Sequence, residues 1–154
     1  MSGKVLPFLL LLSLLLTPLI SNCGGAAAGG ETAVVANSRV PRMAPLEQMP
    51  HEVQKAPQAV REAYQFAAAS PEIVAQLPCY CGCGTFGHKS NYDCYVDDVD
   101  PDSTITYDLH AIGCTICVDI TQDAMAQMRR GNSLMEIQSY VEVKYAQYGP
   151  STMP

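Results

Sequence analysis

The spacing of hydrophobic positions predicts two consecutive helices in the middle of the chain. Residues 57–69 combine good helix formers with apolar positions three or four residues apart, the pattern of an amphipathic helix. Ser70 followed by Pro71 is typical of a helix start, whereas Pro78 cannot continue a helix. We therefore expect one helix over 57–69 and a short second helix that ends at about Leu77.

The periodic pattern is absent from residues 78–107, which are rich in Gly, Asp and Pro. This composition predicts an ordered loop, with a single short extended piece around residues 104–107. A loop of this length is uncommon in a compact domain. Something must hold it in place, and its cysteines are the obvious candidates.

Two more helices are predicted after the loop. A long one is expected from about Leu109 to Arg130, with Asp108 as its N-terminal cap and Gly131 as its stop. Residues 133–136 read SLME, a capping box that starts the last helix. The buried face of that helix is expected to consist of Leu134, Ile137, Val141 and Tyr145. The sequence thus predicts an all-α fold, a small single-domain helical array with a long cysteine-rich loop before a long helix.

The N-terminal part of the chain has a different character. An unbroken apolar run from Val5 to Leu16 follows a lysine, which is typical of a secretory signal peptide and too short for an ordinary spanning helix. The next segment, Ile20-Ser21-Asn22-Cys23, is similar to a bacterial lipobox, so we expect residues 1–22 to be removed and Cys23 to be lipidated. Cleavage near residues 26–28, which gives a free secreted protein, is the alternative.

Residues 23–50 have no period and are rich in Gly, Ala and Pro, a composition that favours a flexible tether. Residues 51–154 then form one cysteine-rich helical domain. Either kind of processing places the mature chain outside the cytoplasm. With a lipid on Cys23, the expected location is the outer side of a bacterial cell membrane.

Charge and motifs limit the classes of function. The chain has 15 Asp and Glu against nine Lys and Arg, a net charge of −6, so it lacks the basic surface that nucleic acids require. No catalytic triad, phosphate loop or catalytic carboxylate pair is recognisable, and we expect a protein that is not an enzyme. Asp98, Asp100 and Asp102 have the spacing that opens a calcium loop, but Ser103 and Leu109 stand where such a loop needs glycine and glutamate.

The cysteines are concentrated between residues 79 and 117, beginning with three at alternate positions. In an extended segment Cys79, Cys81 and Cys83 would project to one side, with neighbouring Cα atoms roughly 6.6 Å apart and parallel Cβ directions. Disulfides need Cβ atoms about 3.8 Å apart, so bonds within the triplet are disfavoured. Convergence on one ion or thiolate cluster is favoured, with Gly82 and Gly84 allowing the backbone to fold around it.

A second set of thiols lies on the long predicted helix. His110, Cys114 and Cys117 are four and three residues apart and share one face near the N-terminus of the helix, where a thiol pKa is lowered. Met125 and Met128 continue the same face. We expect both methionines to be core residues and not ligands.

These motifs resemble a known family. PCYCGCG at residues 78–84, GHKS at 87–90, DC at 93–94 and HAxxCxxC at 110–117 are similar to the PCYCGC-motif lipoproteins of bacteria, over about residues 57–148. The resemblance implies a lipid-anchored envelope protein with a cysteine-rich site that is suspected of binding metal.

We expect the site to bind a thiophilic metal for trafficking or sequestration. Soft thiolates and an extracytoplasmic location favour Cu(I), whereas a Cys₄ or Cys₃His set would suit Zn(II). Six thiolates exceed a single tetrahedral zinc site and favour a copper cluster. The expected ligands are Cys79, Cys81, Cys83, Cys94, Cys114 and Cys117, with His88 and His110 in addition.

Two other interpretations of the cysteines stay open. Small exported domains often carry disulfides, which would make the loop part of a stapled structural or interaction module. Cys114 and Cys117 form a CxxC at a helix start and could exchange thiols and disulfides. The chain lacks the alternation of strands and helices that a thioredoxin-like domain would show.

Overall fold

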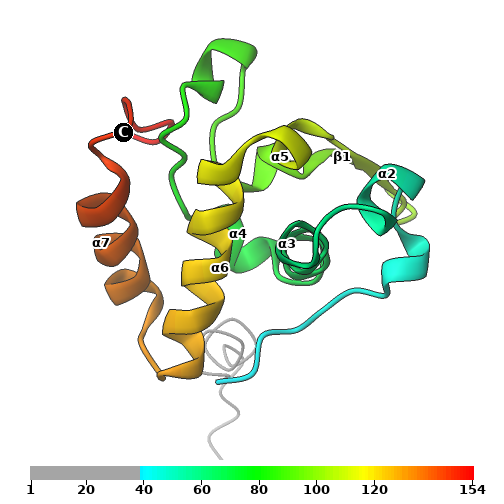
Figure 1. Ribbon diagram of the computed structural model, residues 1–154, viewed down its shortest axis with the longest axis horizontal. Helices are drawn as coiled ribbons and strands as arrows, with labels where there is room; N and C mark the ends of the chain where they lie inside the picture. Colours follow the sequence, from blue (N-terminus) through cyan, green and yellow to red (C-terminus); the bar gives the residue numbers. More distant parts are fainter. Residues whose placement is uncertain (1–38) are drawn as a thin grey trace, which may run out of the picture.

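Helix α6 (Thr115–Arg129) is the central element of the computed structural model, which describes residues 39–154. Helix α3 (Gln58–Ala69) packs on one side of α6, and α7 (Leu134–Tyr145) packs on another (Figure 1). Their apolar faces form one core. Its largest fully buried side chains include Tyr64, Tyr95, Phe66, Leu77, Ile120, Met125 and Ile137.

Shorter elements complete the described part of the chain. They are the 3₁₀ helix η1 (Leu46–Gln48), α2 (His51–Gln54), α4 (Pro71–Val74), η2 (Cys83–Phe86), η3 (Tyr92–Cys94) and α5 (His110–Gly113). None of the helices described in residues 39–154 is long and apolar enough to cross a membrane.

The predicted signal peptide (1–22), the lipidation site Cys23 and most of the predicted tether lie outside the described residues. The described end of that tether contacts the domain. Ala44 donates a backbone hydrogen bond to the carbonyl of Gln65 in α3, at 2.9 Å, and Met49 is 4% exposed. The packed part of the chain therefore includes residues before His51.

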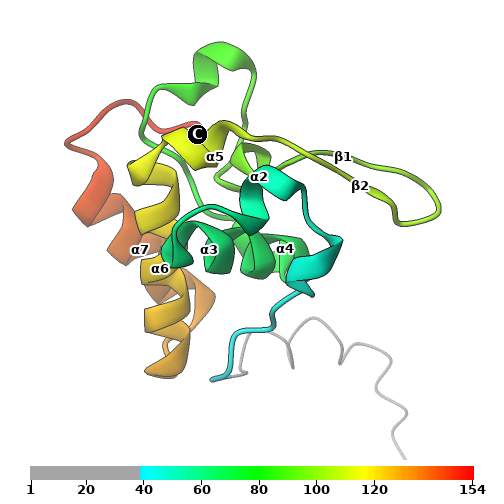
Figure 2. The same cartoon turned by 45° about the vertical axis from the view of Figure 1, so that its right-hand side comes forward.

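The prediction of an all-α fold is wrong, because the loop contains a two-stranded antiparallel sheet. Strand β1 (Val96–Val99) pairs with β2 (Ile105–Tyr107), with a register shift after Val96. The hairpin extends away from the helices (Figure 2). The sequence does not reveal this hairpin, because Asp is uncommon in strands. Most of β1 is also exposed, so no alternation of buried and exposed positions marks it. The fold is mixed α/β, although mostly helical.

The aspartates with calcium-like spacing belong to this hairpin. Asp98, Asp100 and Asp102 are exposed, and the backbone of Asp100 bonds to Thr104 across the turn at 2.9 Å. Ser103 has a φ of 70° there. The DxDxD segment thus comprises the end of β1 and the hairpin turn.

The single helix predicted for residues 109–130 is also a misassignment, because the chain breaks at Cys114. This residue has an extended backbone (φ −116°, ψ 99°) between α5 and α6. Gly113, a poor helix former, precedes the break, and the β-branched Thr115 follows it. The sequence period runs through this point unchanged, so the pattern alone could not reveal the interruption.

The expected helix ends are mostly confirmed. Gly131 ends α6 with a φ of 85°. The Asp108 carboxylate accepts the His110 backbone N–H at 2.6 Å, but the N-cap of α5 is Leu109, one residue later than expected. Ser133 and Glu136 form the predicted capping box. The Ser70 cap is an exception: the hydroxyl is buried without a hydrogen-bond partner, and α4 ends at Val74.

The C-terminal segment returns to the cysteine-rich loop. Thr152 exchanges two hydrogen bonds with Cys79: the Cys79 N–H donates to its hydroxyl at 2.9 Å, and its own N–H donates to the Cys79 carbonyl at 3.0 Å. Gly149 lies against the next residue of the loop. A Cβ at Gly149 would be 2.7 Å from the carbonyl oxygen of Tyr80.

We therefore expect Gly149→Ala to lower the free energy of unfolding by about 1–3 kcal/mol, because a Cβ there forces the backbones apart. Urea denaturation measures this change. Gly113→Ala is the matched control, since a Cβ at Gly113 meets nothing within 4 Å and alanine favours the helix. Equal effects of the two substitutions would contradict the close approach at Gly149.

Candidate metal centre

Three cysteines reach the site from the PCYCGC segment. Cys79 lies outside any helix or strand, Gly82 adopts a left-handed conformation (φ 85°), and Cys83 begins the short helix η2. The three cysteines therefore do not lie on one extended segment. The turn at Gly82 nevertheless brings the sulfurs of Cys79, Cys81 and Cys83 within 4.8 Å of one another.

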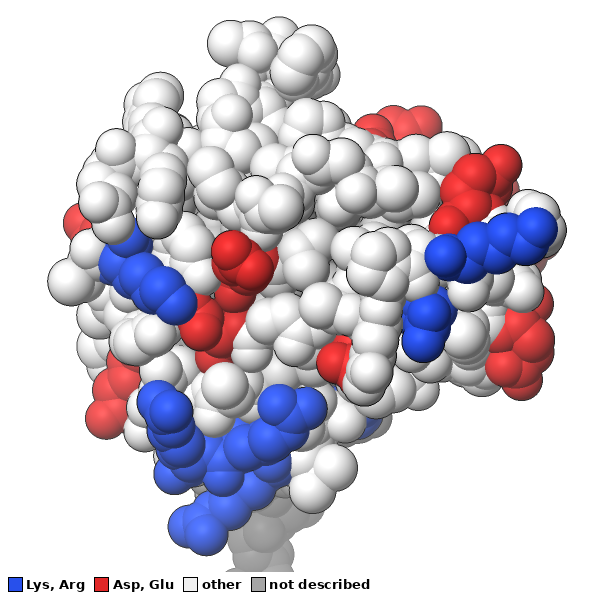
Figure 3. All heavy atoms as spheres, viewed as in Figure 1, with Lys and Arg blue, Asp and Glu red and all other residues white. Residues whose placement is uncertain are grey.

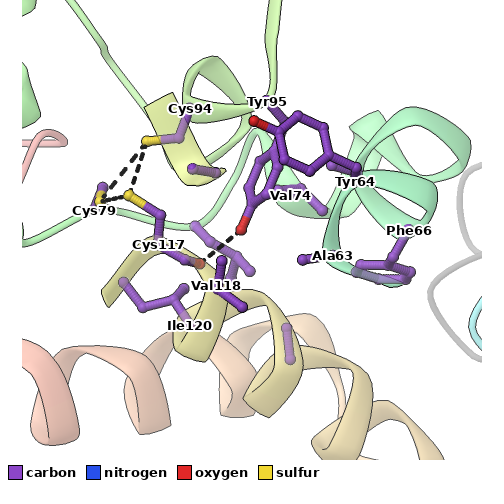
Figure 4. Close-up of a cluster of buried hydrophobic side chains, with 14 of the residues drawn as sticks. Ala63, Tyr64, Phe66, Val74, Cys79, Cys94, Tyr95, Cys117, Val118 and Ile120 are labelled. Atoms are coloured by element: carbon purple, nitrogen blue, oxygen red, sulfur yellow. Dashed lines mark hydrogen bonds between the residues drawn. The ribbon is translucent and has the colours of Figure 1, made fainter. Parts of the chain in front are cut away.

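Cys117, in the first turn of α6, lies at the centre of the thiols. Its Sγ atom is 3.0 Å from that of Cys114, 3.2 Å from Cys94, 3.4 Å from Cys79 and 3.6 Å from Cys81. Figure 4 shows the sulfurs of Cys79, Cys94 and Cys117 pointing toward one another from three separate segments. One sulfur with four sulfur neighbours is not the arrangement of isolated pairs.

The remaining thiols join the same cluster. Cys83 lies 3.7 Å from Cys94, Sγ to Sγ, and Cys94 lies 4.0 Å from Cys79. Cys81 and Cys114 are partly exposed, whereas the other four cysteines are buried. All six described cysteines are free thiols, and they form one continuous group of sulfurs.

Both candidate histidines border this group. His110 places Nε2 3.7 Å from the Sγ of Cys81. His88 places Nδ1 3.5 Å from the Sγ of Cys94 and Nε2 3.5 Å from a carboxylate oxygen of Asp108. A carboxylate on the far nitrogen orients a histidine that faces a metal, so Asp108 is a supporting residue. The sequence analysis assigned it only as a helix cap.

The cysteine and histidine side chains form overlapping groups that could hold a metal ion. Within each group the candidate ligand atoms lie within 4.8 Å of one another. The groups are Cys81, His110, Cys114 and Cys117; Cys79, Cys94 and Cys117; Cys79, Cys81 and Cys83; and Cys83, Cys94 and His110. The first is a Cys₃His set, and His110 belongs to it despite the break in the helix.

Hydrogen bonds among the thiols lower the pKa of some cysteines and raise that of others. The bond with Cys117 lowers the pKa of Cys114 to about 5, although burial raises it. Bonds with Cys117 and Cys94 lower the pKa of Cys79 as well. The pKa of Cys117 is raised, because its hydrogen bonds with Cys114, Cys79 and Cys94 favour its protonated form. The cluster thus favours loss of a proton from Cys79 and Cys114 over loss from Cys117.

The lysines and arginines of the described residues supply no positive charge to thiolates in this cluster. Among residues 39–154, no lysine or arginine side chain pairs with a cysteine sulfur. Buried anions require a compensating charge or a proton. The cluster is therefore chemically suited to a cation.

One side of the cluster is open to solvent through the two histidines. A cavity of about 600 Å³ lies over them, and Phe86 stands at its edge, 75% exposed and 5.9 Å from the His110 ring. The cavity is lined by Phe86, Gly87, His88, Lys89, Asp93, Val96, Asp97, Asp108 and His110. Three carboxylates and two imidazoles against one lysine make it a favourable approach for a cation.

A buried polar network fixes the loop to α6. Tyr95 donates a hydrogen bond to the Cys117 carbonyl at 2.8 Å, and its hydroxyl lies 2.7 Å from that of Thr121. Asn91 donates to Thr121 at 2.6 Å and to the carbonyl of Leu77 at 2.8 Å. No sequence motif indicates this network. The feature of the sequence that points to it is Thr121, which lies on the same helix face as Cys117.

The methionines further along α6 are placed as expected. Met125 and Met128 are 0% and 3% exposed and belong to the hydrophobic core.

We expect Thr121→Val to lower the free energy of unfolding by about 1–3 kcal/mol, because it leaves the buried Asn91 amide without its partner. Thr115→Val, at an exposed position of the same helix, is the matched control and should change stability by less than about 0.5 kcal/mol. Urea denaturation compares them. Equal stabilities would show that the network does not anchor the loop.

Comparisons with known proteins agree with the motifs. Residues 12–154 match the profile of a family described as "Protein of unknown function with PCYCGC motif". Neither the curated proteins nor the solved structures gave a match. Since the family profile covers nearly the whole sequence, the chain belongs to the PCYCGC-motif family.

Proposed function

We propose that this protein binds thiophilic metal ions, Cu(I) foremost and Zn(II) second, for trafficking or sequestration in the bacterial envelope. The position of Cys117 carries the proposal, because its sulfur has four other cysteine sulfurs within 3.6 Å. Such convergence of soft ligands is the requirement of a thiolate metal site.

The sulfur spacing is compatible with a shared ion. Two thiolates on a tetrahedral zinc, with Zn–S bonds of about 2.3 Å, lie about 3.8 Å apart. The sulfurs here are separated by 3.0–4.0 Å. A small contraction or expansion of the cluster would therefore admit an ion in place of the Cys117 proton.

The overlap of the ligand groups favours two ions with a shared thiolate. Cys117 belongs both to the Cys₃His group and to the group with Cys79 and Cys94. Cys83 borders the second group through Cys94. Six thiolates, in two groups that share the Cys117 sulfur, suit a Cu(I) cluster better than a single tetrahedral zinc, which needs only four ligands.

A lipid on Cys23 would attach the protein to the outer side of the cell membrane. We propose a role in binding and not in catalysis, which a centre surrounded by sulfurs supports. Cys81, Cys114 and His110 are partly exposed, so they would be the first ligands to meet an incoming ion, and His110 also lines the cavity.

Two alternatives make different predictions for the same thiols. Three disulfides would form a stapled interaction module. A redox role is favoured by the 3.0 Å distance between Cys114 and Cys117 and by the lowered pKa of Cys114. The contacts of Cys117 with three further thiols argue against it, because an isolated pair avoids mispairing.

Elemental analysis and native mass spectrometry of the exported protein, purified without chelator or reductant, separate these cases. The expected mass exceeds that of the apoprotein by bound metal, with six thiols titratable once the metal is removed. A metal-free mass lower by the hydrogens lost in three disulfides would overturn the proposal and support the stapled module.

Single cysteine variants test the shared ligand. Cys117→Ser should lose both ions, whereas Cys114→Ser should lose only the ion of the Cys₃His group, because Cys114 belongs to no other group. Cys94→Ser is the complementary control for the second ion, because Cys94 belongs to the group with Cys79 and Cys117 and not to the Cys₃His group. Metal content per chain is the measurement, and circular dichroism verifies folding. Full metal content in Cys117→Ser would exclude Cys117 as a bridging ligand.

A further inference from the structure

Three arginines from two segments meet at the end of α6 that is remote from the cysteines. Arg129 and Arg130 close the helix and are exposed. Arg39 reaches the same place, because its Nε atom is 3.2 Å from the position of a Cβ on Gly131. Figure 3 shows basic side chains gathered at this lower end of the molecule. We call Arg39, Arg129 and Arg130 the arginine surface.

The arginine surface has no acidic partners within the described residues. The ion pairs of residues 39–154 are Arg42 with Glu72, His88 with Asp108, and Lys144 with Asp123. The dipole of α6 favours two arginines at its C-terminal end. It does not account for Arg39, which arrives from another segment and adds a like charge at close range.

One exposed apolar side chain adjoins Arg39 in the chain. Val40 is 72% exposed. Arginines beside exposed apolar side chains are the composition of surfaces that lie on anionic membranes. In a chain with a net charge of −6, such a surface attracts an anionic membrane at one end, while the acidic remainder is repelled.

We infer that the arginine surface rests on anionic lipid headgroups and fixes the orientation of the domain. The chain joins the domain at Arg39, so an N-terminal membrane attachment would lie on the same side. Cys117 is twelve residues from Arg129 along α6, which places the two about 18 Å apart along the helix axis. The cysteine cluster and its open cavity would then face away from the membrane.

The inference uses the N-terminal attachment proposed above but not metal binding. The test is hydrogen–deuterium exchange of the full chain incorporated into vesicles, either phosphatidylcholine alone or phosphatidylcholine mixed with phosphatidylglycerol. Flotation of the chain with both kinds of vesicle first verifies the attachment. Residues 39–43 and 129–132 should exchange more slowly on the phosphatidylglycerol vesicles, while residues 79–94 should exchange equally on both.

Replacing Arg39, Arg129 and Arg130 with glutamine should abolish this protection. Each arginine is worth about fivefold in affinity for the surface, so their joint loss should reduce contact about 100-fold. At about 1 M salt, where screening acts over about 3 Å, the protection of the unaltered chain should also disappear.

The matched control replaces Lys55, Lys89 and Lys144 with glutamine, which changes the net charge equally at other places. Protection should persist in it. Three results would each overturn the inference: no difference between the two kinds of vesicle, protection that survives in the arginine variant, or loss of protection in the lysine variant. A chain that does not float with phosphatidylcholine vesicles would instead refute the attachment, and protection on phosphatidylglycerol alone would then still support the arginine surface.

Discussion

Attachment of the cysteine-rich loop to the first turn of α6 is the interaction on which the rest of the structure depends. Tyr95 bonds to the carbonyl of Cys117, and Asn91 bonds to Thr121 one turn further along. These bonds are buried, where a lost partner is costly. They hold the cysteine-rich loop, which has only short 3₁₀ helices, at a fixed position along α6. The sulfurs meet because the backbones that carry them are already held.

Regular helices and the chemistry of the site were accessible from the sequence, whereas their geometry was not. The spacing of apolar positions in residues 57–69 and the capping box at Ser133 reflect local preferences, which can be recognised in the sequence itself. The break at Cys114 interrupts a perfect period. The hairpin forms although Asp is uncommon in strands, because its two strands pair with each other. In both cases the hydrophobic pattern alone does not reveal the conformation.

The candidate site shows the same division. Spacing alone brought together His110, Cys114 and Cys117, and this grouping survives although the continuous helix assumed for it does not exist. The convergence of loop and helix thiols on Cys117 depends on contacts over 23 to 38 residues, which only the fold supplies. Asp108, Asn91 and Thr152 support the site from positions that carry no motif. Ordinary polar residues of this kind become recognisable only in three dimensions.

The hydrogen bonds between Thr152 and Cys79 join residues 73 positions apart. Synthesis proceeds from the N-terminus, so the PCYCGC segment emerges long before the residues that hold it in place. Until Thr152 is available, the segment lacks a backbone partner on that side. A truncation that removes Thr152 and spares every cysteine would therefore still remove both hydrogen-bond partners of the Cys79 backbone.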